Sequence, residues 1–201
     1  MKAVALIVSA AAIFAGGSAL AQSGRGAAAP APVPMKKASE LLKKQEPPVI
    51  NKKLADTINQ DNSYVIVSLG KQRAYLMVGE EVYIDTPISS GKRAGMTPTG
   101  KFTVQEKDPD HHSSLYGNFV DRKGRVVRGG ISLKVDSAPS GSHYEGAPMK
   151  WFCRFSGAVG MHIGILPGYP ASHGCVRLPE AIAPIIYQKV KVGTPVEVRP
   201  D

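Results

Sequence analysis

The sequence has few of the residues that define several classes of protein. It contains 2 cysteines and 1 tryptophan among 201 residues, and aromatic side chains make up 6% of the chain. Two cysteines are too few for the disulfide framework of a small secreted domain. The apolar stretch Ala3–Phe14 is shorter than the roughly 20 residues that cross a bilayer. The length and the 43% hydrophobic content indicate one ordinary globular domain.

Acidic residues are also scarce, and the formal net charge is +9. Residues 1–60 carry 8 basic and 3 acidic side chains, whereas residues 61–201 carry 17 and 13. A nucleic-acid-binding domain gathers its positive charge on the folded surface. Because the charge here is concentrated in the first third of the chain, nucleic acid is not an expected partner.

That first third has the features of a targeting segment followed by a tether. A basic start, a short apolar stretch and the small-x-small site Ala19–Ala21 predict a signal peptide at residues 1–21. Residues 22–62 are rich in Ala, Pro and Lys and predict an extended tether. Its lysines either attract an anionic envelope polymer or are simply solvated. The chain is therefore expected to be secreted to the periplasm or cell envelope, without a stable transmembrane anchor after cleavage.

Residues 63–200 show a pattern of strands interrupted by turns. β-branched and aromatic runs at 63–69, 72–78 and 82–88 predict two consecutive hairpins. Further strands are expected at 101–106, 131–135, 149–155, 157–163 and 195–199, and one helix at 179–190 despite Pro184. We therefore expect a mainly β domain, an antiparallel β-sandwich or flattened barrel with one or two short helices.

The stretch from His162 to Arg177 contains the residue types that nucleophilic catalysis needs. A histidine ends a strand, a Gly/Pro-rich loop follows, and His173 stands two residues before Cys175. The thiolate is the nucleophilic form of cysteine, and a nearby base or positive charge must generate it. His162 is the candidate base. Either residue alone would be interpreted as structural, but their combination favours a catalytic site.

The glycine before the cysteine supports the same interpretation. Attack on an amide carbonyl puts negative charge on its oxygen, and backbone N–H groups stabilise this charge where no side chain blocks the approach. The N–H groups of His173, Gly174 and Cys175 are the expected donors. Arg177 lies on the face of Cys175 if the segment is extended, and there it either holds a substrate carboxylate or forms a structural ion pair.

The run Ser172–Pro179 (Ser-His-Gly-Cys-Val-Arg-Leu-Pro), preceded by His162, resembles the active-site signature of the L,D-transpeptidase catalytic domain. Ser89–Lys92 and Thr97–Phe102 are similar to two upstream motifs of that family. The resemblance covers residues 63–198. It implies Cys175 as nucleophile and His162 as base, with His173 and Gly174 at the oxyanion turn and Ser172 and Arg177 as supporting residues.

The resemblance also implies an activity. A tetrapeptide stem of peptidoglycan would acylate Cys175 with loss of its terminal D-alanine, and an amine would then resolve the thioester. The acceptor could be another stem peptide, a lysine of an envelope protein or a free D-amino acid. No cofactor or metal is implied. A peptidoglycan hydrolase, such as an L,D-carboxypeptidase that uses the same site, is the alternative, and a wall-binding module with a degenerate site is a third possibility.

Three features depart from the commonest pattern of the family. The upstream motif is His162–Gly164 (His-Ile-Gly) where many members have His-Gly, and the loop to Ser172 is short. Residues 117–148 do not align, and we expect either a lid or substrate-binding insertion, or a plain surface loop. Cys153 is expected to be a buried strand residue rather than the disulfide partner of Cys175. The spacing of His111, His112 and His143 matches no zinc pattern.

Overall fold

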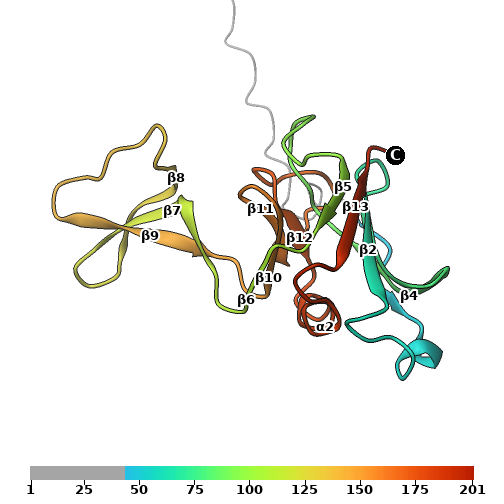
Figure 1. Cartoon of the computed structure of the whole chain (residues 1–201). Helices are drawn as coiled ribbons and strands as arrows, with labels where there is room; N and C mark the ends of the chain where they lie inside the picture. Colours follow the sequence, from blue (N-terminus) through green and yellow to red (C-terminus); the bar gives the residue numbers. More distant parts are fainter. Residues whose placement is uncertain (1–43) are drawn as a thin grey trace, which may run out of the picture. The chain divides into compact units, whose positions relative to one another are not determined.

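The computed structural model describes residues 44–201. The predicted signal peptide at residues 1–21 and the first part of the predicted tether, residues 22–43, lie outside this range. Residues 44–201 form three β-sheets and a single α-helix (Figure 1). Within the same range, no helix has the length and apolar character needed to cross a membrane.

A six-stranded sheet forms one side of the folded unit, in the order β1-β4-β3-β2-β13-β5. Its strands are β1 (Val49–Ile50), β2 (Ser63–Ser68), β3 (Arg73–Val78), β4 (Glu81–Pro87), β5 (Gly100–Thr103) and β13 (Pro195–Arg199). Strands β2, β3 and β4 confirm the two hairpins predicted at residues 63–88. Because β13 pairs in parallel with β2 and antiparallel with β5, the last strand lies inside the sheet rather than at its edge.

A four-stranded sheet, in the order β12-β11-β10-β6, packs against the first. Its strands are β6 (Glu106–Asp108), β10 (Phe152–Ser156), β11 (Val159–Ile163) and β12 (Val176–Leu178). Cys153, Met161 and Val176 are register partners across β10, β11 and β12, and all three are buried in the core. Since successive side chains of a strand point to opposite faces, the other face of this sheet is free to carry polar groups.

The helix α2 (Ala183–Lys189) closes the core between the two sheets. It is shorter than the predicted range of 179–190. Pro184 is accommodated because it lies in the first turn, where a helix has no partner for the backbone N–H that proline lacks. The mainly β, sandwich-like architecture with a short helix is thus confirmed.

Part of the predicted tether belongs instead to the folded unit. β1 pairs with β4, and the short 3-10 helix η1 (Lys52–Leu54) follows it. Leu54 and Ile58 are both buried in the core. Full burial of such a side chain stabilises the folded state by about 2 kcal/mol. This gain offsets the entropy lost when the segment is ordered, a loss that the lysine- and proline-rich composition had suggested would keep it extended. The tether prediction is therefore wrong for residues 49–58.

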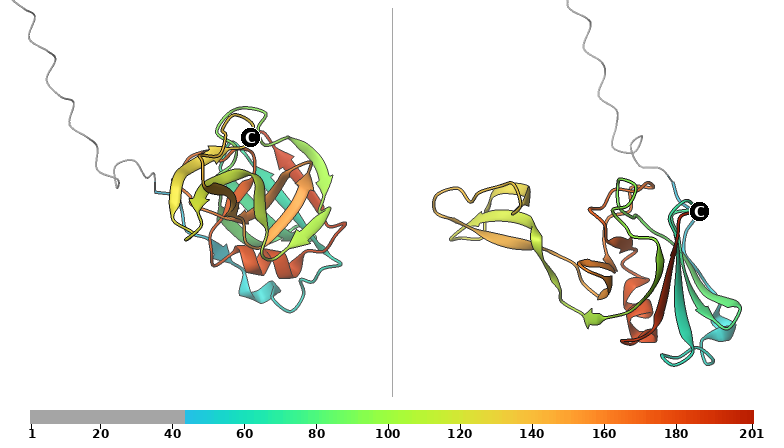
Figure 2. Two further views of the ribbon diagram at one scale, coloured as in Figure 1. Left: turned by 90° about the vertical axis from the view of Figure 1, so that its left-hand side faces the viewer. Right: turned by 45° about the horizontal axis from the view of Figure 1, so that its top comes forward.

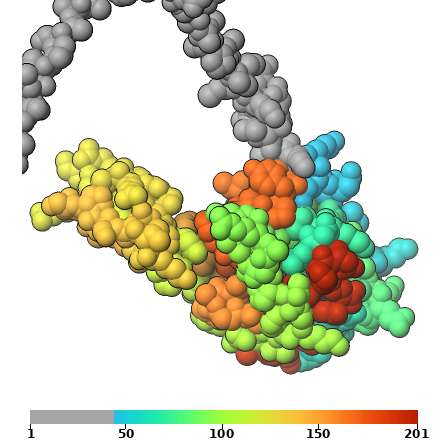
Figure 3. Space-filling view, turned by 90° about the horizontal axis from the view of Figure 1, so that it is seen from above, coloured from blue at the N-terminus to red at the C-terminus, as the bar shows by residue number. Residues whose placement is uncertain are grey.

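Residues 112–148 form a third sheet, here called the lobe, in the order β8-β7-β9. Its strands are β7 (His112–Asp121), β8 (Val126–Ser132) and β9 (Ser142–Pro148). Figure 2 and Figure 3 show the lobe in yellow, projecting beside the two packed sheets. The plain surface loop considered for residues 117–148 is therefore wrong, because most of this segment pairs as strands.

Candidate functional site

The parallel pairing of β11 and β12 brings the predicted nucleophile and base to one face. His162 is the register partner of Arg177, and Met161 is the partner of Val176. Cys175 immediately precedes β12, so continuing this register places it opposite Gly160. Partners in adjacent strands point to the same side. The side chains of His162, Cys175 and Arg177 therefore share the face of the four-stranded sheet that points away from the core.

The Cys175 thiol is partly buried, and burial is the largest influence on its pKa. Burial raises the pKa of this thiol, while a backbone hydrogen bond from Gly160 and the charges of Arg154 and Arg177 act in the opposite direction. The sulfur also lies 3.8 Å from the Ala158 carbonyl oxygen, to which the thiol donates. The resting residue is thus a protonated thiol that needs a base before it can attack.

His162 is oriented as a base. It is 7% exposed, and its Nδ1 lies 2.7 Å from the Ile163 carbonyl oxygen. Because a carbonyl only accepts, Nδ1 carries the proton and the lone pair of the neutral ring is on Nε2. Burial is the main reason why the pKa of His162 falls to about 4. The ring is therefore neutral at pH 7 and able to accept a proton, and the Ile163 carbonyl supplies the orienting contact that the sequence left open.

A turn from Ser172 to Cys175 holds the nucleophile. The Ser172 hydroxyl donates to the Cys175 carbonyl at 2.5 Å and accepts from the Gly174 N–H at 3.0 Å. Gly174 has φ +139, and a Cβ there would lie 2.8 Å from the Met96 carbonyl oxygen, so a larger residue does not fit. The Gly174 N–H is committed within the turn, which leaves the N–H groups of His173 and Cys175 as the other expected oxyanion donors.

The upstream motifs of the sequence lie against this turn. Ser89 pairs with Arg177 and Gly91 pairs with Ser172. The Thr97 hydroxyl donates to the Gly174 carbonyl at 2.6 Å and accepts from the Gly91 N–H at 2.9 Å. In Figure 3, the green segment that contains these motifs lies against the orange segment before the nucleophile. We call Ser89–Lys92 the strap, because it contacts the loop on both sides of Cys175.

Arg177 provides a positive charge on the same face. Its Nη1 lies 3.4 Å from the Ile165 carbonyl oxygen, and burial lowers its pKa from the usual value. Gly164 gives the side chain room, since a Cβ there would lie 2.6 Å from Arg177 Cγ. None of the salt bridges within residues 44–201 involves Arg177.

His173 is exposed, and the lobe contacts it. The Tyr116 ring of β7 stacks on the His173 ring, with centroids 4.2 Å apart and an interplanar angle of 14°. On the strap, Lys92 Nζ lies 3.2 Å from His173 Nε2. Burial and the charge of Lys92 lower the pKa of His173. The ring is thus held as a neutral group, with Nε2 accepting from the ammonium and Nδ1 carrying the proton.

The other cysteine lies on the core side of the same sheet. Cys153 is 1% exposed and faces the core, on the opposite side of the sheet from Cys175, so no disulfide can join them without rearrangement. Burial raises the pKa of Cys153 to about 12. His112 bonds to Asp110, and His143 lies on β9.

One group of potential metal ligands, Glu106, Asp108 and His111, does occur. Its ligand atoms lie within 4.8 Å of one another. Arg154 already pairs with Glu106 at 2.7 Å, and His111 Nδ1 lies 3.1 Å from Asp108. These contacts give each of the three groups a partner without an ion.

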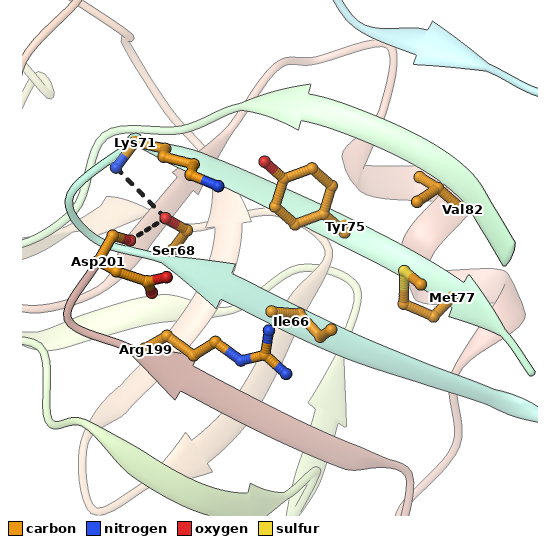
Figure 4. A pocket seen from close by; sticks show the side chains of 8 residues that line it. All are labelled: Ile66, Ser68, Lys71, Tyr75, Met77, Val82, Arg199 and Asp201. Atoms are coloured by element: carbon orange, nitrogen blue, oxygen red, sulfur yellow. Dashed lines mark hydrogen bonds between the residues drawn. The ribbon is translucent and has the colours of Figure 1, made fainter. Parts of the chain in front are cut away.

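A shallow hollow lies on the outer face of the six-stranded sheet (Figure 4). Its lining residues are Ile66, Ser68, Lys71, Tyr75, Met77, Val82, Arg199 and Asp201. None of these belongs to the group around Cys175. The hollow is therefore separate from the candidate site.

Comparisons with known proteins place this geometry in a family. The model of the L,D-transpeptidase catalytic domain matches residues 62–198. No curated protein matches the chain.

Similar solved structures include an L,D-transpeptidase from Mycobacterium smegmatis, with 23% identity and a TM-score of 0.50 over 69% of this chain and 58% of that one. A mutant L,D-transpeptidase from Enterococcus faecium has 24% identity and a TM-score of 0.50, covering 69% of this chain and 50% of that one. The transpeptidase LdtMt1, in complex with imipenem, has 20% identity and a TM-score of 0.50, covering 68% and 58%. At these identities the structures show a shared fold, and this chain spans only part of each relative.

Proposed function

Because this chain belongs to the L,D-transpeptidase catalytic domain family, we propose that it is a secreted cysteine acyltransferase that acts on peptidoglycan stem peptides. The observation that supports this most directly is the pairing of β11 with β12, which brings His162, Cys175 and Arg177 to one face. The predicted signal peptide and the location of peptidoglycan outside the cytoplasm are the reasons for proposing secretion to the periplasm or cell envelope.

The first half of the reaction acylates the enzyme. His162 Nε2 takes the thiol proton as Cys175 Sγ attacks the carbonyl at the L-centre of the diamino acid in a tetrapeptide stem. The oxygen becomes an oxyanion, which the N–H groups of His173 and Cys175 stabilise. The C–N bond then breaks, His162 returns the proton to the departing amine, and D-alanine leaves. A thioester on Cys175 remains.

The second half transfers the acyl group. An amine attacks the thioester carbonyl, gives a proton to His162, and forms a new amide as the thiol is released. A second stem peptide would give a crosslink, and a lysine of an envelope protein would give protein attachment. If water attacks instead, the product is a tripeptide stem and the enzyme is an L,D-carboxypeptidase. Arg177 and Lys92 supply positive charge for a substrate carboxylate beside the reacting carbonyl.

Mass spectrometry of the products separates these outcomes. Purified protein is incubated with a tetrapeptide muropeptide, with and without an amine acceptor. Transfer gives the mass of the new amide, and hydrolysis gives the tripeptide. Unchanged activity in the presence of a chelator is expected, whereas loss of activity would indicate a metal-dependent peptidase. If neither product forms, the proposed function is wrong.

A carbapenem offers an independent test of the same nucleophile. One relative of similar fold is known in complex with imipenem, and a β-lactam carbonyl is open to the same attack by a thiolate. We expect imipenem to add one mass adduct to the wild-type protein and none to the Cys175→Ala variant. An adduct on the Cys175→Ala protein would contradict the assignment of Cys175.

A further inference from the structure

The turn between β2 and β3 contains Gln72, whose side chain points into the protein. Gln72 is 7% exposed, and its backbone has a φ of 52°, in the left-handed region that non-glycine residues rarely adopt. It stands 103 positions before Cys175 in the chain. A buried amide in a tight turn has to be hydrogen-bonded to be tolerated.

Every polar atom of the Gln72 side chain has a partner, and most of the bonds go to the strap. Oε1 accepts from the Ser90 N–H at 3.0 Å. Nε2 donates to the Ser90 hydroxyl at 2.8 Å and to the Leu69 carbonyl at 2.6 Å. The main chain adds a further bond, because the Gln72 carbonyl accepts from the Ile88 N–H at 3.0 Å. Gln72 therefore holds the strap by its side chain and holds the residue just before the strap by its backbone.

Ser90 passes this constraint to the loop that contains the nucleophile. It is 3% exposed, and its carbonyl accepts from the N–H groups of both Ala171 and Ser172, at 3.0 and 2.9 Å. On the other side of Cys175, Ser89 and Arg177 exchange two backbone hydrogen bonds, at 3.0 and 3.1 Å. The strap thus fixes the loop at both ends, and Gln72 fixes the centre of the strap.

Ser172 completes the connection to the reacting group. Its hydroxyl bonds to the Cys175 carbonyl and to the Gly174 N–H, as described above. From Gln72 to Ser90, from Ser90 to Ser172, and from Ser172 to Cys175, each step is a hydrogen bond between groups that are buried or partly buried. Such bonds are directional and poorly replaced by water.

We propose that Gln72 is a positioning residue for the Cys175 nucleophile, acting through Ser90 and Ser172. It touches neither Cys175 nor the place where substrate would react, so its effect is on where the thiol lies. An effect of Gln72 on catalysis rests on the function proposed above. An effect of Gln72 on the reactivity of the Cys175 thiol does not. A displacement of about 1 Å at a reacting atom can reduce a rate by about 100-fold.

Two substitutions separate the bonds. Gln72→Met keeps the length of the side chain and removes all three of its hydrogen bonds. Gln72→Glu keeps an acceptor for the Ser90 N–H and removes both donated bonds. Gln60→Met is the matched control, because Gln60 is an exposed glutamine whose Nε2 donates to a backbone carbonyl, that of Gln188, at 2.9 Å.

The readouts are the pH profile of Cys175 alkylation by iodoacetamide, and kcat and KM for acyl-enzyme formation, each measured below the melting temperature of the variant. For Gln72→Met we expect kcat to fall about 10-fold to 100-fold with little change in KM. We also expect the alkylation midpoint to shift from its wild-type pH, because a displaced sulfur changes its burial, its contact with the Gly160 N–H and its distance from Arg177. Gln72→Glu should change in the same direction, and Gln60→Met should match the wild type.

If folded Gln72→Met shows the wild-type alkylation profile, the proposal is overturned. It is also overturned if the activity of Gln72→Met falls only in proportion to the fraction of that variant that is unfolded. If Gln72→Met does not fold, Ser90→Ala removes one of the same bonds and leaves the backbone contacts. It should produce the same shift in the profile, and a wild-type profile would again overturn the proposal. If the wild type forms no acyl-enzyme, the proposed function fails while the alkylation comparison still decides the role of Gln72.

Discussion

His162 lies directly opposite Arg177 in the parallel pairing of β11 with β12. A base and a cation therefore stand side by side on the face where the Cys175 thiol emerges. Burial keeps the imidazole neutral, and the same burial disfavours the thiolate. The site consequently begins as a neutral pair, and the base is expected to remove the thiol proton during attack.

The two cysteines should differ strongly in reactivity. Cys175 is partly accessible, whereas Cys153 is 1% exposed and has a pKa of about 12. Iodoacetamide should label Cys175 more than about 100-fold faster, since only thiolate reacts and the core excludes the reagent. Peptide mapping measures both sites, and labelling in guanidinium is the control in which both should react. Equal rates in the folded protein would contradict the structure.

His162 should make the protein less stable in acid. Its folded pKa of about 4 lies below the ordinary value of 6.5, so the unfolded chain binds more protons between these two pH values. The free energy of unfolding should therefore fall as the pH drops from 6.5 to 4, by about 3 kcal/mol from this residue. Urea unfolding at pH 7 and pH 4.5 measures the change. The free energy of unfolding of His162→Gln should fall less than that of the wild type over this interval. An identical fall would contradict the low pKa of His162.

Arg177 should favour the Cys175 thiolate. Its charge acts to lower the pKa of the thiol, against the larger effect of burial, so Arg177→Gln should raise that pKa and slow alkylation at pH 7. Arg128→Gln is the control, because Arg128 lies on the lobe and pairs with Asp136. The pH profile of alkylation is the measurement. The account would be wrong if both variants gave the wild-type profile.

The Tyr116 ring should support the oxyanion turn through its stack on His173. An aromatic stack of this kind contributes about 1 kcal/mol, so Tyr116→Ala should lower kcat/KM for acyl-enzyme formation about fivefold. Tyr116→Phe keeps the ring and should retain near-wild-type activity. If the alanine variant is as active as the phenylalanine variant, the lobe does not assist the site through this contact.

The candidate residues around Cys175 could be predicted from the sequence because they are nearly contiguous. Residues 160–178 contain the nucleophile, the base, the glycine of the turn and Arg177, and β11 and β12 lie at the two ends of this stretch. Residue type, spacing and the family resemblance therefore predict these residues as the candidate site. The orienting contact of His162 was not predictable, because it is made by a backbone carbonyl that every residue possesses.

Other features of the structure could not be predicted from the sequence because they depend on tertiary contacts. Gln72 acts through bonds to Ser90, 18 positions away, and the sequence has no signal for such a contact. Strand β8 of the lobe begins with five consecutive exposed residues, 126–130, so it lacks the alternation that indicates a strand. Leu54 and Ile58 stand in a lysine-rich segment that resembles a tether, and only the core beneath them shows otherwise.

The central claim is that Cys175 carries the acyl group. Intact-mass analysis of the wild-type protein with a tetrapeptide muropeptide should show an adduct equal to the stem minus D-alanine, and an added amine should discharge it. Cys175→Ala should show no adduct, and Cys153→Ala should behave as the wild type. An adduct that persists in Cys175→Ala, or stem peptide processed at the wild-type rate by that variant, would contradict the account.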